Sequence, residues 1–512
     1  MLIRKLGLTE KSIERANREA STSTIVTYSK IRGPLNSMLL ERSFNQAVKR
    51  YPLLAARIVR RGRSLYFAKT EAHTIPVEVK SLSSASEWES CYQAELNRPL
   101  DSSLGLSRAL LLTTPDPQLH YLLITTHHAV SDGLSCGYIH TEIVNICNRL
   151  VVQRTQMNQL QPLLHQAVHP KAVHPKVVTA PLPCEDDAGV SQPVLPPVEQ
   201  MLPADFKGYA GWKKSMKLLA QLLRNARQLN LDYLPTTSIP LESRRTRVIQ
   251  RRMDSRQMAA LANLSACKRT TPNALITSAM LIAVARQLNL APGRAATLAT
   301  QLIIDLRRYL LPLGSDPKLL KTARIGRSWV TNCSENVMHS YQVASDHNIW
   351  ELADQIKGRL RQSIRKREML SYPYLKQLLL QMSIWRSHSP SLSVATSSVG
   401  EVDLSIKPYN GQTLFEIEDY SGAMSVALYA GAFMMIASQL KGELTINFLF
   451  SEPTLDECTM QVLVQETMRQ IEALIPLSSD ALASRPTSAW IREASGSTLA
   501  PSDPAELMKL SA

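Results

Sequence analysis

One stretch of the chain, residues 121–133, constrains the fold more than any other. It reads YLLITTHHAVSDG. Its first half is apolar and contains β-branched side chains, which is typical of a buried strand. Its second half turns polar and contributes His127, His128, Asp132 and Gly133. A buried strand that ends in titratable side chains places them at the end of a sheet, where binding and catalytic sites are commonly built.

Histidine at such a position suits proton transfer, because its unperturbed pKa of about 6.5 lies close to neutral pH. A positioned general base contributes roughly 10²- to 10⁴-fold to a reaction rate. Asp132 follows His128 by four residues, so it could orient the imidazole or fix the turn through an ion pair elsewhere. Gly133 would permit a tight backbone there. From the residues alone, two alternatives to acid–base catalysis stay open: the histidines could be structural side chains held by hydrogen bonds, or they could bind zinc.

A metal site is the weaker of these alternatives. Zinc takes three or four nitrogen, sulfur or oxygen ligands, and adjacent residues of a strand point to opposite faces. His127 and His128 are therefore poor ligands for one ion. Two further histidines, His169 and His174, lie in the short tandem AVHPKAVHPK, with no cysteine-and-histidine ligand spacing around them. We expect no metal at either place.

Composition excludes several classes of protein. The chain has 512 residues, 44% of them hydrophobic, which is enough for a large core and roughly two to four domains. The formal net charge is +15, but aromatic residues make up only 5% and do not interleave with the basic runs. No helix-turn-helix or zinc-finger pattern is present, so we expect no nucleic-acid partner. The positive charge could instead attract an acidic protein or a phosphorylated cofactor, or be scattered and solvated.

Location and redox state are also indicated by the sequence. The amino terminus, MLIRKLGLTEKS, lacks the apolar core of a secretory signal. We read the most apolar segment, residues 421–440, as buried strands rather than a transmembrane span, because glycines and serines interrupt it. The seven cysteines are dispersed without CxxC spacing. This pattern predicts reduced thiols and a cytoplasmic protein.

The motif HHxxxDG, formed by residues 127–133, resembles the signature of the chloramphenicol acetyltransferase-like superfamily. That group includes nonribosomal peptide condensation domains, plant BAHD acyltransferases, wax ester synthases and phthiocerol dimycocerosyl transferases. Further stretches match in the same order, namely YPLLAARI, ATQLIIDLRR and INFLF. The DFGWG motif of the BAHD enzymes is absent. The amino-terminal IRKL and the helix–DLR succession are most similar to the phthiocerol dimycocerosyl transferase-like branch.

The resemblance implies an α/β fold of two similar lobes, with mixed sheets, packed helices and an active-site tunnel between the lobes. We place the N-terminal lobe with the histidine motif at residues 1–152 and the C-terminal lobe at residues 204–475. The proline-rich stretch 153–203 is expected to be a flexible linker or insertion. Residues 476–512, rich in Ser, Ala and Pro, are expected to be a mostly disordered tail.

The resemblance also implies roles for the motif residues. His128 would be the general base, with His127 and Gly133 in supporting positions. An arginine at the end of a strand pairs with the motif aspartate in the resembling families, and the D-x-R pattern assigns that role to Arg307. The pairing would make Asp132 architectural rather than catalytic. The alternative is that these charges are exposed at a loop, since charged residues are rarely buried.

A second polar-ended strand, SLSVATSSVGEV, contributes Thr396, Ser397 and Ser398. It resembles the strand whose small polar residues reach the tunnel in this superfamily. One of these hydroxyls could donate a hydrogen bond to a tetrahedral oxyanion. The alternative is that they are ordinary hydroxyls at a strand end.

The activity implied is O-acyl transfer from a thioester to an alcohol hydroxyl, forming an ester of a lipid, polyketide or other secondary metabolite. The donor would be acyl-CoA or an acyl group on the phosphopantetheine arm of a carrier protein, which is usually acidic. No bound cofactor and no metal are required. Two alternatives stay open, an amide-forming condensation enzyme with an amine acceptor and an inactive binding scaffold. We expect a monomer.

Overall fold

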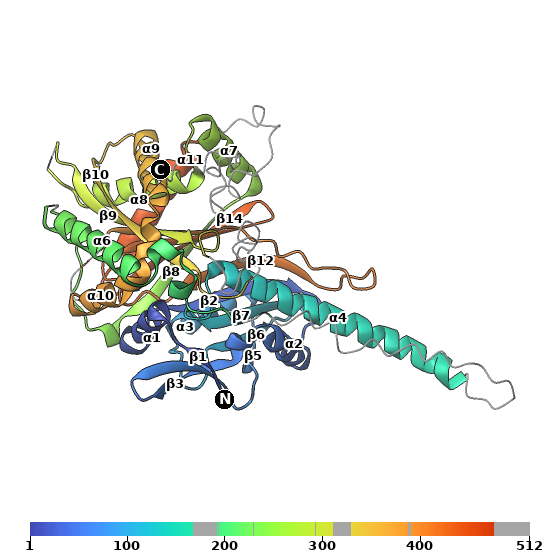
Figure 1. Cartoon of the computed structure of the whole chain (residues 1–512). Helices are drawn as coiled ribbons and strands as arrows, with labels where there is room; N and C mark the ends of the chain where they lie inside the picture. Colours follow the sequence, from blue (N-terminus) through green and yellow to red (C-terminus); the bar gives the residue numbers. More distant parts are fainter. Residues whose placement is uncertain are drawn as a thin grey trace, which may run out of the picture.

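The computed structural model is a mixed α/β protein of two lobes, in which three sheets are packed with helices (Figure 1). It describes residues 1–166, 192, 194–228, 230–291, 293–310, 329–387, 390 and 392–475. The expected fold class, α/β with two lobes of mixed sheets and packed helices, is confirmed. The tandem with His169 and His174 and the expected tail at 476–512 lie outside the described residues.

The N-terminal lobe is built on a five-stranded sheet with the order β12-β2-β7-β6-β5. Its strands are β2 (Thr24–Arg32), β5 (Val77–Ser81), β6 (Ser107–Thr113), β7 (Leu119–His127) and β12 (Glu416–Met424). A small sheet, β1-β4-β3, consists of β1 (Leu2–Lys5), β3 (Ala56–Arg61) and β4 (Ser64–Lys69). The helices of this lobe are α1 (Leu8–Ala20), α2 (Ser37–Arg50), α3 (Trp88–Asn97) and α4 (Gly133–Gln166). Because β12 comes from the C-terminal half, the two halves of the chain share one sheet.

The C-terminal lobe is built on a six-stranded sheet with the order β10-β9-β11-β13-β14-β8. Its strands are β8 (Arg245–Met253), β9 (Ala296–Asp305), β10 (Ser334–Val343), β11 (Val394–Glu401), β13 (Phe433–Leu440) and β14 (Glu443–Glu452). Its helices are α5 (Val198–Met201), α6 (Gly208–Gln228), α7 (Ser255–Cys267), α8 (Pro272–Gln287), α9 (Ile349–Arg365), α10 (Tyr372–Trp385) and α11 (Glu457–Glu472). Helix α8 packs against both α9 and α11, and α6 lies beside α10 (Figure 1).

Strand β7 is buried on both faces, which explains its unbroken apolar run. Leu122 and Ile124 belong to the core beneath α2 and α4. Leu123 belongs instead to a core that also contains Ala395 and Met434 of the six-stranded sheet. The second face of β7 is therefore covered by a core that α3 of the same lobe shares with the six-stranded sheet. This packing fixes the end of β7, with its histidines, beside the junction of the two lobes.

Helix α8 forms where its capping residues and apolar content predict it. Thr271 is the N-cap, and its hydroxyl accepts the Ala274 N–H at 3.2 Å. Pro272 takes the first helical position, where its missing N–H is not needed. All but three of the helical residues are buried. Helix α8 is thus a central core helix of the second lobe.

The structure contradicts both ends of the flexible linker that was predicted at residues 153–203. Helix α4 continues to Gln166 instead of ending at 152, and it extends away from the body of the molecule (Figure 1). The residues after 152 are mostly straight-chain types with good helix propensity, which continue a helix without a periodic apolar face. At the other end, Val198, Met201 and Leu202 are buried in the core of the second lobe. That segment is packed, not flexible.

Candidate active site

His128 lies in the turn that follows β7. Its backbone N–H donates to the carbonyl oxygen of Ser23 at 3.1 Å, which ties the turn to the start of β2. Its Nδ1 lies 2.8 Å from the carbonyl oxygen of Ser131. A carbonyl oxygen can only accept, so Nδ1 carries the hydrogen and Nε2 keeps a free lone pair. The backbone therefore selects the tautomer that a general base needs.

The surroundings keep this imidazole neutral. Burial lowers the pKa of His128 from its usual 6.5 to about 4. The hydrogen bond to Ser131 opposes that shift, and the positive charge of Lys376 adds to it. At pH 7 the imidazole is therefore neutral, with Nε2 as the hydrogen-bond acceptor.

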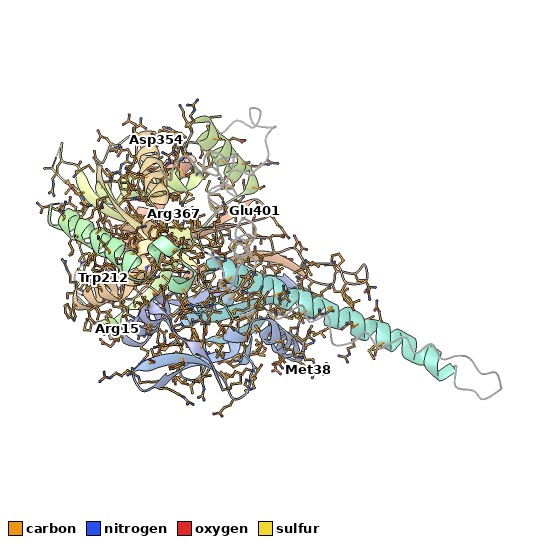
Figure 2. The ribbon with its side chains drawn as sticks, in the orientation of Figure 1. Arg15, Met38, Trp212, Asp354, Arg367 and Glu401 are labelled. Atoms are coloured by element: carbon orange, nitrogen blue, oxygen red, sulfur yellow. The ribbon has the colours of Figure 1, made fainter. Side chains whose placement is uncertain are left out.

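A cavity of about 590 Å³ reaches His128. One wall is apolar and comes from α6 and α10, with Leu218, Leu219, Leu379 and Leu380. The opposite wall comes from β9, β10 and α9 and carries polar side chains. Figure 2 labels Trp212 on α6 and Arg15 on α1, two of the helices that border the cavity. A second entrance to His128, from the far side of the lobe junction, stays a prediction.

Asp132 and Arg307 form a buried bidentate ion pair. Arg307 Nη1 donates to Asp132 Oδ2 at 2.8 Å, and Nη2 donates to Oδ1 at 3.1 Å. The exposed fraction of the arginine side chain is 2%. Arg307 also donates to Asp305 Oδ1 at 3.0 Å and to the carbonyl oxygens of Trp329 and Thr331. The pairing implied by the resemblance is thus present, and the alternative of charges exposed at a loop is wrong for Arg307.

Asp132 also fixes the start of α4 and the approach of the second lobe. Its Oδ1 accepts from the Ser135 N–H at 2.9 Å, which is the bond of a helix N-cap. Its Oδ2 accepts from the Cys333 N–H at 2.9 Å, just before β10. Burial alone would raise the pKa of Asp132, but the charge and hydrogen bonds of Arg307, with these backbone donors, outweigh it and leave the pKa lowered. The carboxylate is therefore ionised and architectural in its contacts.

His127 points away from His128, as expected for neighbours at a strand end. Its side chain is fully buried, and its Nδ1 accepts the Ala129 N–H at 3.1 Å. Its Nε2 lies 3.2 Å from Glu14 Oε2 on α1, although the two atoms are not aligned for a hydrogen bond. Glu14 in turn accepts from the Ser102 hydroxyl at 2.8 Å. His127 thus connects β7 to α1.

Gly133 is required for a different reason from the one we expected. Its backbone is not in the left-handed region that favours glycine. A Cβ at this position would lie 2.8 Å from Val399 Cγ2 on β11. The glycine therefore permits a close approach of α4 to the second lobe, and the expected tight turn is not the explanation.

Strand β11 carries the three hydroxyl residues that were expected to be candidate oxyanion donors. Thr396 is buried, and its Oγ1 accepts from the Thr277 hydroxyl of α8 at 3.3 Å. Ser397 and Ser398 are half-buried, and none of the three lines the cavity that reaches His128. Alternate residues of β11 face the α8 core and the lobe junction. Ser398 Oγ is buried and has no hydrogen-bond partner among the described residues, and the oxyanion role stays a prediction.

Several residues of the site carried no sequence signal that we used. Ser135 could have been found, because Asp132 followed by a helix start and Ser135 is an N-cap pattern. The sequence gives no sign of three other residues, Glu14, Glu335 and Lys376, because each reaches the site only through tertiary packing. Glu335 and Lys376 line the cavity and form an ion pair at 2.8 Å.

Three further observations concern the described part of the chain. Within it, no group of three His, Cys, Asp or Glu side chains is placed to hold a metal ion. Among the helices searched there, none is both long and apolar enough to cross a membrane. The six cysteines that can be placed, Cys91, Cys136, Cys147, Cys267, Cys333 and Cys458, are free thiols.

Two family models match the chain in succession. The condensation domain model matches residues 13–172, which include the histidine motif. The model for the phthiocerol/phthiodiolone dimycocerosyl transferase C-terminus matches residues 242–449, which include Arg307 and β11. Together they extend over both lobes. No curated protein sequence gives a significant match.

Solved structures with similar folds cover nearly the whole chain. Polyketide synthase associated protein 5 from Mycobacterium tuberculosis has a TM-score of 0.58 at 14% identity, covering 93% of this chain and 97% of its own. Trichothecene 15-O-acetyltransferase from Fusarium sporotrichioides has a TM-score of 0.63 at 12% identity, with 92% and 95% covered. The first condensation domain of the CDA synthetase gives 0.58 at 12% identity, with 94% and 97% covered. At these identities the likeness establishes the shared fold alone.

Proposed function

We propose that this chain, which belongs to the chloramphenicol acetyltransferase-like superfamily that contains the condensation domains, is an O-acyltransferase. Its C-terminal half is of the phthiocerol/phthiodiolone dimycocerosyl transferase type. The enzyme moves an acyl group from a thioester to an alcohol hydroxyl. The observation that carries this proposal is the free Nε2 of a neutral His128 at the end of a cavity. The name of one structural relative, an O-acetyltransferase, and that of the C-terminal family model, a dimycocerosyl transferase, support this reaction class.

The proposed reaction begins when the acceptor hydroxyl donates a hydrogen bond to His128 Nε2. The imidazole takes the proton as the hydroxyl oxygen attacks the thioester carbonyl. The tetrahedral intermediate then collapses, the carbon–sulfur bond breaks, and the imidazolium returns the proton to the departing thiolate. The step uses no acyl-enzyme, no metal and no resident cofactor. The Ser131 carbonyl keeps the ring in the reactive tautomer throughout.

The donor is proposed to be acyl-CoA or an acyl group on the phosphopantetheine arm of a carrier protein. The net charge of +15 suits either an acidic carrier or the phosphates of CoA. The free cysteines of the described part support a reducing, cytoplasmic location.

Replacing His128 by Ala tests the base directly. Purified wild type and H128A are incubated with a panel of acyl thioesters and alcohols, and products are identified by mass spectrometry. Turnover is expected to fall roughly 10²- to 10⁴-fold, the usual contribution of a positioned base. His73, which is exposed and does not line the cavity, offers the matched control H73A with wild-type turnover expected.

Other outcomes separate the alternatives. Unchanged turnover in H128A would remove the base assignment. Products formed only with amines would favour an amide-forming condensation enzyme, a reaction suggested by the match to the condensation domain model. Absence of product with every donor and acceptor pair would favour a binding scaffold.

A further inference from the structure

Helix α6 exposes a row of large apolar side chains. The rings of Tyr209 and Trp212 stack with their centroids 6.0 Å apart, although the two residues are 77% and 48% exposed. Met216, which is half-buried, and the exposed Leu223 continue the row, because steps of three, four and seven residues keep side chains on one side of a helix. We call these four residues the apolar strip. Large apolar side chains that gather on an exposed face mark an interaction surface.

A row of positive charge runs beside the apolar strip. Lys213, Lys217 and Arg224 are exposed, and steps of four and seven residues align them along the helix. Lys214 pairs with Asp205, whereas these three have no ion-pair partner among the residues that the structure describes. Residues 207–231 contain six Lys and Arg residues and no Asp or Glu. The helix therefore does not neutralise its own charge.

The apolar strip is continuous with the wall of the cavity that reaches His128. Leu223 is exposed and also lines this cavity, together with Leu219 and Leu222 of the same helix. Helix α10, which packs beside α6, adds the exposed side chain of Trp385 (Figure 1). A partner that covers the apolar strip therefore lies at the rim of the cavity.

The composition of this surface favours a lipid bilayer over a protein partner. Protein–protein interfaces are depleted in lysine. Helices that lie flat in the surface of a bilayer combine Trp and Leu with neighbouring Lys and Arg, and Trp and Tyr are enriched at the level of the headgroups. Positive charge beside the aromatic rings complements anionic headgroups, and each Lys or Arg near such a surface strengthens binding roughly fivefold.

We propose that α6 docks the protein onto an anionic lipid surface. Trp212 and Leu223 enter the apolar layer, and the three unpaired cations contact the headgroups. The helix then lies in the plane of the surface, and the rim of the cavity at Leu223 faces the lipid. This docking is a property beyond the proposed reaction and does not depend on it.

Sedimentation of the full-length protein with lipid vesicles tests the proposal. The wild type is expected to bind phosphatidylcholine vesicles that contain about 30% phosphatidylserine roughly 10²-fold more tightly than vesicles of phosphatidylcholine alone, since three cations each contribute about fivefold. K213Q/K217Q/R224Q should lose most of this difference. W212S/L223S should bind the anionic vesicles at least about tenfold more weakly, because it removes apolar surface that enters the lipid. Added salt should weaken the binding of the wild type.

Matched controls carry the same changes on the other side of the molecule. Figure 2 shows Met38, at the start of α2, on the side opposite Trp212, and Val79 lies on β5, which packs against α2. Both are exposed, so M38S/V79S is expected to keep wild-type binding. The charge control, R42Q/K49Q/R154Q, removes three exposed cations of α2 and α4 and should also bind like the wild type.

Several results would overturn the proposal. These are no binding of the wild type to anionic vesicles, unchanged binding in both α6 variants when circular dichroism shows them folded, and an equal loss in the control variants. A wild-type dimer that binds no vesicles and that W212S/L223S dissociates would assign the apolar strip to a second copy of the chain instead. Vesicle binding needs no turnover, so α6-dependent binding without any ester product would leave the docking surface standing while the proposed reaction fails.

Discussion

Replacing Asp132 by Asn is expected to damage the fold far more than the base. In the structure Asp132 neutralises Arg307, which is 2% exposed. The only other carboxylate that pairs with Arg307 in the described part of the chain is that of Asp305. Breaking a buried pair by removing one charge costs about 3–5 kcal/mol. The variant D132N keeps the shape of the side chain but replaces one acceptor oxygen by a donor NH2 group, so the cost combines the uncompensated guanidinium with the loss of the backbone hydrogen bond from Ser135 or Cys333.

A double-mutant cycle isolates that interaction. The free energies of unfolding of D132N, R307M and the double variant are measured in urea by tryptophan fluorescence and far-UV circular dichroism, where the two transitions coincide. Each single substitution is expected to cost about 3–5 kcal/mol. The double variant should cost less than the sum of the two by up to about 3 kcal/mol, the upper range for residues in direct contact. D305N, at a carboxylate 23% exposed, should cost about 1 kcal/mol or less.

Activity assays on the same proteins complete the test. Asp132 makes no hydrogen bond to His128 in the described structure. At a temperature where D132N is folded, its turnover should therefore fall much less than that of H128A. The reasoning is refuted if D132N has wild-type stability and yet loses turnover as completely as H128A, since the carboxylate would then act on the imidazole.

Two further predictions concern pH and packing. Because the pKa of His128 is about 4, the base is already neutral at pH 5, and kcat/KM should be flat from pH 8 to pH 5 and fall as pH approaches 4. A tenfold loss between pH 7.5 and 5.5 would instead indicate an ordinary pKa near 6.5. G133A places a Cβ 2.8 Å from the stiff Val399 side chain and should destabilise the protein by about 1–2 kcal/mol in the same urea assay. The double variant G133A/V399A should recover most of that loss, whereas no loss in G133A would contradict the close approach.

The sequence indicated several secondary-structure elements and the position of His128 at the end of a strand. The apolar run before His127 predicted β7, because a buried strand is recognised from its own consecutive residues. The order of the motifs predicted the family and, through it, the pairing of Asp132 with Arg307. The end of α4 was missed, because good helix formers without an apolar stripe resemble a linker in sequence.

Only the tertiary structure decided which polar groups share the cavity. Thr396 was a plausible oxyanion donor from its position in β11, but the register of the sheet turns it toward α8. Glu335 and Lys376, 41 residues apart, meet because β10 and α10 pack around the same space as His128. Chain order fixes strands, caps and motifs, since these depend on local chemistry. Which side chains meet across two lobes depends on long-range packing, and one sequence alone does not specify it.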